Sequence, residues 1–377
     1  MKTVVTEFPQ EPGLCYLNHA AVAPWPKRTM QAVTQFAIEN MTLGATHYPR
    51  WLTKEAQLRE QLRELINAPT RDDIALLKNT SEALSVVAYG LPWQAGDNIV
   101  ISDQEFPSNR IVWESLANRG VELRSVALES AATPEEALLQ AIDSRTRLLS
   151  ISSIQYATGV RLHLERLGDY CHTHQVLFCV DAIQSLGALP LDVQAIHADF
   201  VMADGHKWLL GPEGVALFYC SSRAREWLTL QQFGWHMVEN LGDYDTKTWQ
   251  IAASARRFEC GSPNMLGIHA LSASLSLLLE SGMTTIGQQV VERSQYLLEP
   301  LSQHPAIELI TPQQRDRFGG IVTFKLKAHD PQQLFNHLRQ QRVICAVRGG
   351  GIRFSPHFYT EQALLDNALA VVFEQLG

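Results

Sequence analysis

The chain has 377 residues, of which 46% are hydrophobic and 19% charged. This is enough apolar material for one large domain with a smaller companion, and it argues against bulk disorder. With 31 basic and 39 acidic side chains the formal net charge is −8. A nucleic-acid binder or an anionic-membrane binder needs a basic face, so neither is expected.

The opening residues lack the apolar core of a secretory signal, and no run reaches the roughly 20 apolar residues of a membrane span. We therefore expect no membrane association and a cytoplasmic location. The six cysteines are scattered without a CxxC pair, so neither a zinc site nor a disulfide framework is indicated.

Short apolar runs alternate with amphipathic helical patterns from about residue 70 to residue 220. This alternation is typical of βαβ units and predicts an α/β fold, a mostly parallel sheet with helices on both faces. An unbroken apolar run such as 176–180 suits a strand that is buried on both sides. The predicted strands are 74–77, 98–102, 121–126, 148–151, 176–180, 200–203 and 215–219, and the predicted helices between them are 81–89, 109–118, 134–141 and 164–174.

The second half of the chain has a different pattern. An irregular segment rich in Trp and Gly, 226–261, precedes long helical patterns at 265–281 and 286–301. Strand-like and helical patterns then alternate to the end, and they predict a separate α+β unit. We expect an N-terminal segment (1–25), a large domain (26–264) and a small C-terminal domain (265–377). The strand-like runs of the last part are 307–310, 320–325 and 343–347, and its helices are 331–340 and a last one from residue 361.

Polar side chains follow two of the predicted strands. Asp181 and Gln184 come after the run 176–180, and His206 and Lys207 come after the run 200–203. Because the carboxyl ends of parallel strands line the ligand crevice, an acid, an amide and a lysine are expected to converge there. Taken singly, a capping Asp and a surface Lys are the simpler interpretations. No GxGxxG, GxxxxGK[ST], GxSxG or HExxH motif occurs, so dinucleotide, P-loop, hydrolase and zincin sites are unsupported.

These segments resemble the class V aminotransferase family, the fold-type-I pyridoxal-phosphate (PLP) enzymes that include cysteine desulfurases, kynureninase and isopenicillin N epimerase. The resemblance runs from YLNHAAVAP, which begins at Tyr16, to IRFSPHFYT, which begins at Ile352. Between them, KNTSEAL, QEFPSN, QYATGV, VDAIQS, DGHKWLLGPEG and RRFECGSPN match in order. The resemblance implies a PLP-dependent enzyme acting at Cα of an amino acid, with no metal, and a homodimer with shared active sites.

The resemblance also implies roles for individual residues around the cofactor. Lys207 forms the Schiff base and, once released, serves as general acid and base. Asp181 faces the pyridinium nitrogen, and Gln184 the phenolic oxygen. The remaining implied roles are those of the phosphate ligands Thr80, Ser81 and His206, the phosphate contact Ser262 supplied by the partner subunit, and Phe106, which stacks on the cofactor ring. The structural alternatives are an ordinary helix N-cap near residue 80 and a phenylalanine that belongs to the core.

On the substrate side, Arg353 is the implied grip on the α-carboxylate, since a guanidinium binds a carboxylate through two hydrogen bonds. Tyr156 and His19 border the implied pocket, although His19 is equally well a packing residue. Asp204 stands where many relatives have a hydroxyl residue. An anion near a phosphate is unfavourable unless it points away, so Asp204 is left out of the expected phosphate ligands.

One departure from the family bears on the reaction. Cysteine desulfurases of this family carry a mobile loop with a nucleophilic cysteine between two arginines like Arg348 and Arg353, and here only the sequence GGGI separates them. Cys345 lies upstream and is expected to be buried and inert. We therefore favour transamination or elimination. A cysteine desulfurase or C–S lyase, an amino-acid epimerase and a non-catalytic fold-type-I scaffold remain alternatives, and the sequence does not name the substrate.

Overall fold

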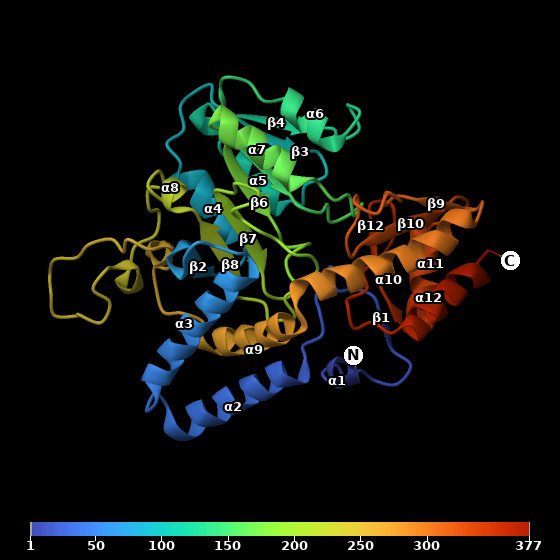
Figure 1. The fold of residues 1–377 in the computed structure, drawn as a ribbon, viewed down its shortest axis with the longest axis horizontal. Coiled ribbons are helices and arrows are strands. Elements are labelled where there is room, and N and C mark those ends of the chain that lie inside the picture. Colours follow the sequence, from blue (N-terminus) through green and yellow to red (C-terminus); the bar gives the residue numbers. More distant parts are fainter. Residues whose placement is uncertain (1, 377) are drawn as a thin grey trace.

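A seven-stranded sheet forms the centre of the structure, a computed structural model that describes residues 2–376. Its strands are β2 (Ile74–Leu77), β3 (Asn98–Ser102), β4 (Glu122–Val126), β5 (Thr146–Ser152), β6 (Leu177–Asp181), β7 (Phe200–Asp204) and β8 (Ala216–Cys220). Their order is β2-β8-β7-β6-β5-β3-β4 (Figure 1). Only β8 runs against its neighbours, β7 and β2. The predicted α/β fold with a mostly parallel sheet is therefore confirmed.

Both faces of this sheet are covered by apolar packing. Along β6, Leu177 and Cys179 join one buried cluster, while Phe178 and Val180 join the other. A strand that is buried on both sides has no polar alternation, which explains the unbroken apolar run in the sequence. The covering helices are α4 (Thr80–Gly90) and α5 (Ser108–Glu114) on one side, and α6 (Pro134–Gln140) and α7 (Leu164–His174) on the other.

The last part of the chain builds a second, smaller sheet. Its four antiparallel strands have the order β12-β13-β10-β9 and are β9 (Ile307–Leu309), β10 (Val322–Leu326), β12 (Ala346–Arg348) and β13 (Gly351–Phe354). The helices α10 (Met283–Gln303), α11 (Pro331–Gln340) and α12 (Gln362–Glu374) pack around it. The N-terminal segment reaches this part through β1 (Cys15–Tyr16), which pairs in parallel with β11 (Val343–Ile344). The predicted strand 343–347 is therefore two short strands in different sheets.

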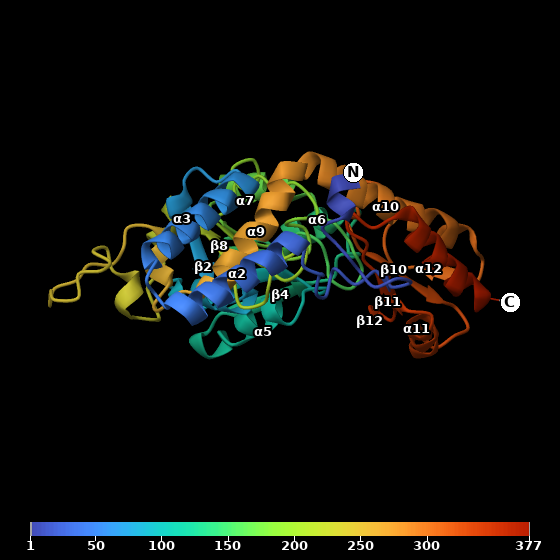
Figure 2. The ribbon, with the colours of Figure 1, turned by 90° about the horizontal axis from the view of Figure 1, so that it is seen from below.

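The helix α9 (Met265–Ser281) packs against α2 (Lys27–Leu43) and α3 (Tyr48–Leu65), and Figures 1 and 2 show the three together beside the large sheet. In packing, α9 thus belongs with the large part, although the expected small domain began at residue 265. The division into 1–25, 26–264 and 265–377 remains a prediction. The remaining elements are the short helices α1 (Lys2–Val5) and α8 (Ser222–Arg225) and the 3-10 turns η1 (Arg71–Asp73), η2 (Ala117–Arg119), η3 (Trp235–Met237) and η4 (Ala255–Phe258).

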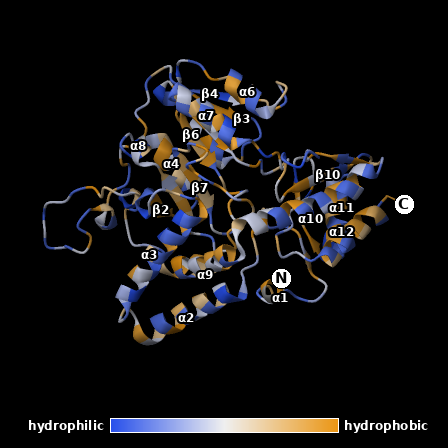
Figure 3. Cartoon of the chain, viewed as in Figure 1, coloured by the Kyte–Doolittle hydropathy of each residue, from blue (hydrophilic) through white to orange (hydrophobic). Residues whose placement is uncertain are grey.

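Hydrophobic residues gather along the central strands and α9, whereas α2 and α3 alternate between polar and apolar positions (Figure 3). Within residues 2–376 no single helix is long and apolar enough to cross a membrane; α9 and α10 pass that test only as a pair bent by 85°. The irregular segment predicted at 226–261 holds no strand and no α-helix, and it extends away from the body of the molecule (Figure 1).

Candidate active site

The side chains predicted to act together follow the carboxyl ends of five strands. Asp181 ends β6, Lys207 follows β7, and Thr80, Phe106 and Tyr156 follow β2, β3 and β5. These strands run in the same direction, because β2 is antiparallel to β8, which is itself antiparallel to β7. Their carboxyl ends therefore share one edge of the sheet, the edge at which open α/β sheets bind ligands.

Lys207 lies in the middle of this edge. Its Nζ is 5.6 Å from the centroid of the Phe106 ring. The pKa of Lys207 is lowered to about 8, mainly by burial and also by the positive charge of Arg353, although the carboxylates of Asp181 and Asp204 oppose the shift. A lysine with a lowered pKa has a larger neutral fraction near neutral pH, and a neutral amine is the nucleophilic form.

Asp181 and Gln184 are buried beside Lys207. The Oδ1 atom of Asp181 accepts a hydrogen bond from the backbone N–H of Ile183 at 3.0 Å. Burial raises the pKa of Asp181 to about 6, against the opposing hydrogen bond from Ile183 and the charge of Lys207. A buried carboxylate of this kind is stabilised by a cationic partner, which a protonated ring nitrogen would be.

The amide of Gln184 is oriented from both ends. Its Nε2 donates to the backbone oxygen of Ala20 at 3.1 Å, and its Oε1 accepts from Nε1 of Trp208 at 3.0 Å. An amide nitrogen carries two hydrogens, so one remains for a ligand oxygen. The side chain therefore fits the predicted contact with the cofactor's phenolic oxygen.

The start of α4 has unsatisfied polar atoms that suit a phosphate. Asn79 caps the helix, since its Oδ1 accepts from the backbone N–H of Glu82 at 2.8 Å. The Thr80 Oγ1 and His206 Nδ1 atoms are buried and have no hydrogen-bond partner within residues 2–376. Buried polar groups are normally paired, and an anion at a helix N-terminus would pair them. Ser81 is exposed, and its hydroxyl donates to Oγ of Ser108 at 2.8 Å.

Asp204 lies beside these unpaired atoms at the start of α4. Its Oδ1 accepts from the backbone N–H of Thr80 at 3.2 Å, and its Oδ2 lies 3.7 Å from Nδ1 of His206. Burial raises the pKa of Asp204 to about 6. The exclusion of Asp204 from the phosphate ligands stays a prediction, although its carboxylate does not point away from the start of α4.

Ser262 lies elsewhere on this chain. It is exposed in a hollow of about 440 Å³ that it shares with Lys78, Glu82 and Cys260, between η4 and α9. Lys207 is not among the described residues that line this hollow. Its predicted role in the partner subunit's site stays a prediction.

The substrate side of the site is formed by rings and a guanidinium. The rings of Phe106 and Tyr156 meet edge to face, with centroids 5.1 Å apart and an interplanar angle of 84°. Arg353 is buried, and its Nη1 donates to the backbone oxygen of Tyr156 at 2.7 Å, while its Nε has no partner within residues 2–376. Burial lowers the pKa of Arg353 to about 10, helped by the nearby charge of Arg348. A buried, incompletely paired guanidinium favours a carboxylate ligand.

A tight hairpin turn joins β12 and β13 at the position where cysteine desulfurases of this family have a longer loop. Arg348 pairs with Gly351, so Gly349 and Gly350 alone make the turn. Their φ angles are +57° and +77°, and positive φ at both central residues defines the type I′ hairpin turn, which glycine adopts without strain. Cys345 is buried, as predicted, and burial raises its pKa to about 12.

His19 packs inside the protein. Its Nδ1 lies 2.7 Å from the backbone oxygen of Ser355, and its Nε2 lies 2.7 Å from the hydroxyl of Tyr359. Burial lowers the pKa of His19 to about 4. Because both ring nitrogens are engaged within the chain, the packing alternative fits better than contact with the substrate.

The burial of His19 predicts an acid-dependent loss of stability. Its folded-state pKa lies below the ordinary histidine value of 6.5, so the unfolded chain takes up the proton first as the pH falls. Between pH 7 and pH 5 this costs roughly 2 kcal/mol of unfolding free energy. The substitution His19→Gln removes that component. In urea unfolding, the stability difference between the two proteins should shrink by that amount over this interval, and a constant difference would contradict the assignment.

One buried carboxyl at the site was not predicted from the sequence. Glu105 accepts hydrogen bonds from the backbone N–H of Ser152 at 2.9 Å, from Nε2 of Gln155 at 3.0 Å and from Nδ2 of Asn109 at 2.8 Å. Burial raises the pKa of Glu105 to about 7. It ties the segment that carries Phe106 to the end of β5. The available signal was an acid between a buried strand and an aromatic residue.

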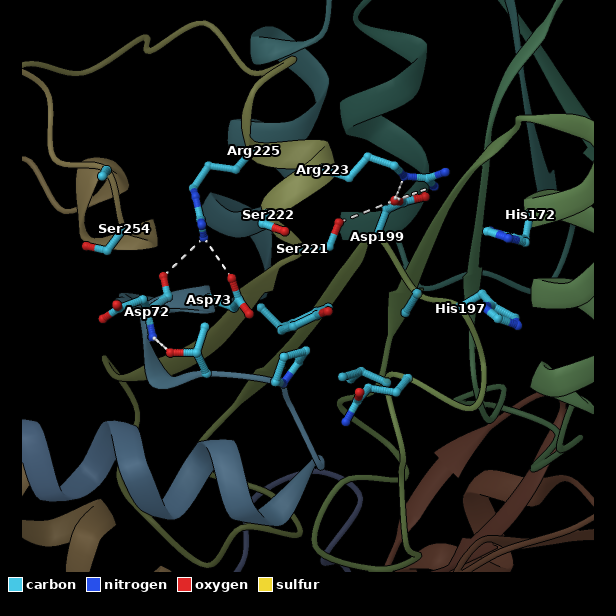
Figure 4. A pocket seen from close by; sticks show the side chains of 17 residues that line it. Asp72, Asp73, His172, His197, Asp199, Ser221, Ser222, Arg223, Arg225 and Ser254 are labelled. Atoms are coloured by element: carbon cyan, nitrogen blue, oxygen red, sulfur yellow. Dashed lines mark hydrogen bonds and ion pairs between the residues drawn. The ribbon is translucent and has the colours of Figure 1, made fainter.

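Two other charged clusters are internally compensated. In a hollow of about 480 Å³ at the opposite edge of the sheet, Asp199 pairs with Arg223 at 2.7 Å and Asp73 with Arg225 at 3.0 Å (Figure 4). The second cluster could hold a metal by the spacing of its side chains, which are Glu55, His236 and Glu259. There, Arg59 already binds both glutamates at 2.6 Å, so a cation would have to displace a guanidinium.

Comparison with known proteins supports the same assignment. The model of the family "Aminotransferase class-V" matches residues 15–361. A probable cysteine desulfurase of Methanothermobacter thermautotrophicus is 30% identical over 366 residues, which is 91% of this chain and 90% of that protein.

Two solved structures of the protein C-DES share the fold. One is the cystine C–S lyase C-DES in complex with its reaction product cysteine persulfide; it is 25% identical, with a TM-score of 0.89, and the match covers 96% of this chain and 98% of that one. The other, a C-DES mutant with glycine covalently linked to the PLP cofactor, is 24% identical with the same TM-score, and 97% of each chain is covered. The chain described here thus belongs to the class V aminotransferase family and is a PLP-dependent enzyme.

Proposed function

We propose that this enzyme cleaves the C–S bond of a sulfur-containing α-amino acid by β-elimination. The Cα proton leaves, the Cβ–S bond breaks, and the sulfur departs as a thiol or persulfide. The remaining fragment takes up water and becomes pyruvate and ammonium. Cystine and water would thus give pyruvate, ammonium and cysteine persulfide. The hairpin at Gly349 and Gly350 carries the proposal, because it leaves no loop for the cysteine that a desulfurase needs as sulfur acceptor.

The relatives support the substrate class. The curated relative at 30% identity is named a probable cysteine desulfurase, and the solved structure at 25% identity is named a cystine C–S lyase. Both names concern breakage of a bond to sulfur. The lyase offers the better parallel, because a lyase of this kind releases its sulfur product and does not store it on the chain.

Cofactor binding is assigned to the residues at the carboxyl edge of the sheet. When bound, PLP supplies an aldehyde that links to an amine and a ring that accepts the electron pair left at Cα. Asp181 would keep the ring nitrogen protonated, Gln184 would donate to the phenolic oxygen, and Phe106 would stack on the ring. Thr80, Ser81 and His206 would hold the phosphate, with Ser262 contributed by the partner subunit.

Lys207 is proposed to attach the cofactor and then to move the proton. With a pKa near 8, its Nζ can take the Cα proton as a neutral amine and return a proton to the departing sulfur. Phe106 stands beside it and carries no proton, so the aromatic position cannot share this task. Arg353 would hold the substrate carboxylate and so orient Cα toward Nζ.

A homodimer is proposed from exposed apolar side chains that the monomer leaves uncovered. On α2, Met30, Ile38 and Met41 are between 48% and 77% exposed, although the helix lies against α9. Large exposed apolar patches are typical of subunit interfaces. The extended segment 226–261 adds the exposed rings of Trp227, Phe233, Trp235, Tyr244 and Trp249.

The reaction is tested by product analysis of the purified holoenzyme with cystine and with cysteine. Elimination yields pyruvate and ammonium in equal amounts, with sulfur released as a small molecule. Desulfuration would instead give alanine and a persulfide on a protein cysteine, detected by alkylation and mass spectrometry. Transamination would give a keto acid that retains its sulfur, together with the amine form of the cofactor. Either of the last two outcomes would overturn the proposal.

A further inference from the structure

The end of β7 places a carboxylate where the cofactor phosphate is expected. Asp204 is the last residue of β7, and its Oδ1 accepts from the backbone N–H of Thr80 at 3.2 Å. Thr80 is the first residue of the 11-residue helix α4. Its N–H is one of the free donors that a helix presents to an anion at its N-terminus. The Thr80 N–H therefore already donates to Asp204, although it could otherwise donate to a phosphate oxygen.

Two unpaired polar atoms beside Asp204 indicate which kind of ligand this site would bind. The Thr80 hydroxyl oxygen is buried, Nδ1 of His206 is buried, and neither has a hydrogen-bond partner within residues 2–376. Nδ1 of His206 lies 3.7 Å from Oδ2 of Asp204. A hydroxyl, a ring nitrogen and a helix N-terminus together suit an oxyanion with several oxygens. The carboxylate of Asp204 satisfies them only in part.

The charges around Asp204 do not neutralise it fully. Lys207 is its cationic neighbour, while Asp181 and Glu213 are anionic. Burial lowers the pKa of His206 to about 4, so this ring is neutral near neutral pH. Burial raises the pKa of Asp204 to about 6, against the opposing effects of Lys207 and the Thr80 N–H. The side chain is therefore an anion at pH 8 and largely an uncharged acid at pH 5.

We propose that Asp204 competes with the cofactor phosphate for the N-terminus of α4, so that this enzyme holds its cofactor less tightly as the pH rises. The inference rests on the phosphate site of the proposed function and adds a control on cofactor affinity. A phosphate and a carboxylate that share one helix N-terminus repel each other strongly in a partly buried site. When Asp204 is protonated, the repulsion disappears and its hydroxyl can donate to the phosphate.

The test compares PLP binding to the apoprotein and to its Asp204→Asn variant. The amide keeps an oxygen for the Thr80 N–H and removes the charge. Titration of tryptophan fluorescence gives the Kd at pH 8 and at pH 5. We expect the variant to bind PLP about tenfold or more tightly than the natural chain at pH 8, and within about twofold of it at pH 5. The ionisation of the PLP phosphate affects both proteins equally, so the ratio of their two Kd values at a given pH does not depend on it.

Pyridoxal, which lacks the phosphate, separates this effect from a general change in the site. The Kd of pyridoxal should differ between the two proteins by a much smaller factor than the Kd of PLP. The repulsion from Asp204 acts on the phosphate, whereas its effect on the pKa of Lys207 acts on both ligands alike. The matched control is Asp103→Asn, which removes an exposed carboxylate just after β3 and should leave both affinities unchanged. Asp204→Ser, with circular dichroism as the check on folding, repeats the comparison should the amide variant misfold.

Three outcomes would overturn the inference. They are equal PLP affinities in both proteins at pH 8, weaker binding by the Asp204→Asn variant, and tightening of pyridoxal by the same factor as PLP. Each of these leaves Lys207 as the attachment point intact. Absence of binding by both ligands in every protein would instead overturn the proposed function together with this inference.

Discussion

We expect the substitution Lys207→Ala to lower kcat/KM by roughly 10⁴-fold or more, because it removes a single atom that has two proposed roles in the reaction. The Nζ atom is the proposed attachment point of the cofactor and the proposed carrier of the Cα proton. It lies 5.6 Å from the Phe106 ring, which can stack but not exchange protons. Pyruvate formation from cystine gives the rate, and the near-visible absorption of the protein after addition of PLP reports attachment.

The control for this variant is Lys327→Ala, which removes an exposed lysine that donates to the backbone oxygen of Pro305, far from the large sheet. It should retain full activity. Added small amines should restore part of the rate to Lys207→Ala, since they can replace the proton carrier. If Lys207→Ala kept more than about a tenth of the activity, the role of this lysine would be refuted.

The second large effect is expected at Arg353. The substitution Arg353→Gln should lower kcat/KM for cystine by roughly 10²- to 10³-fold, because a pair of charge-assisted hydrogen bonds to the carboxylate is lost. The guanidinium is held in place by the backbone oxygen of Tyr156, so its geometry is fixed before substrate arrives. Arg353→Lys should recover only part of the loss, since an ammonium does not reproduce the fork.

Two measurements separate this role from a structural one. Cystamine, which lacks both carboxylates, should be a poor substrate that Arg353→Gln handles as well as the natural enzyme. The positive charge of Arg353 also lowers the pKa of Lys207, and Lys207 takes the Cα proton only as a neutral amine. Removal of Arg353 should therefore shift the acidic limb of the pH–rate profile to higher pH. The exposed Arg315 provides the matched control, Arg315→Gln. A uniform loss on both substrates would argue against carboxylate binding.

The sequence was informative where local pattern decides the structure. Asp181 comes directly after one apolar run that is long enough for a buried strand, and Lys207 comes a few residues after another. Both polar groups therefore lie near strand ends, and the parallel sheet brings them together. The short connection at Gly349 and Gly350 was foreseen on other grounds, as a loop missing relative to the cysteine desulfurases that the sequence resembles. Chain length between two strands sets what can connect them.

Features that depend on distant partners were not predictable in this way. The ring of His19 makes hydrogen bonds with Ser355 and Tyr359, which are more than 300 residues away in the sequence. No sequence pattern near His19 predicts these partners. The direction of the Asp204 side chain is set by the N–H of Thr80 on another element. Glu105 is buried among donors that come from β5 and α5. Such networks follow from tertiary packing, which a single sequence does not specify.

The two-glycine turn between β12 and β13 has a consequence for how sulfur would leave the enzyme. Within residues 2–376 every cysteine except the half-buried Cys260 is buried, and none lies on this turn, so the turn offers no thiol that could hold sulfur between turnovers. The product would diffuse into bulk water as a small, reactive molecule, without hand-over to a docked acceptor protein. Its fate in the cell would then be set by whichever dissolved thiol it meets first.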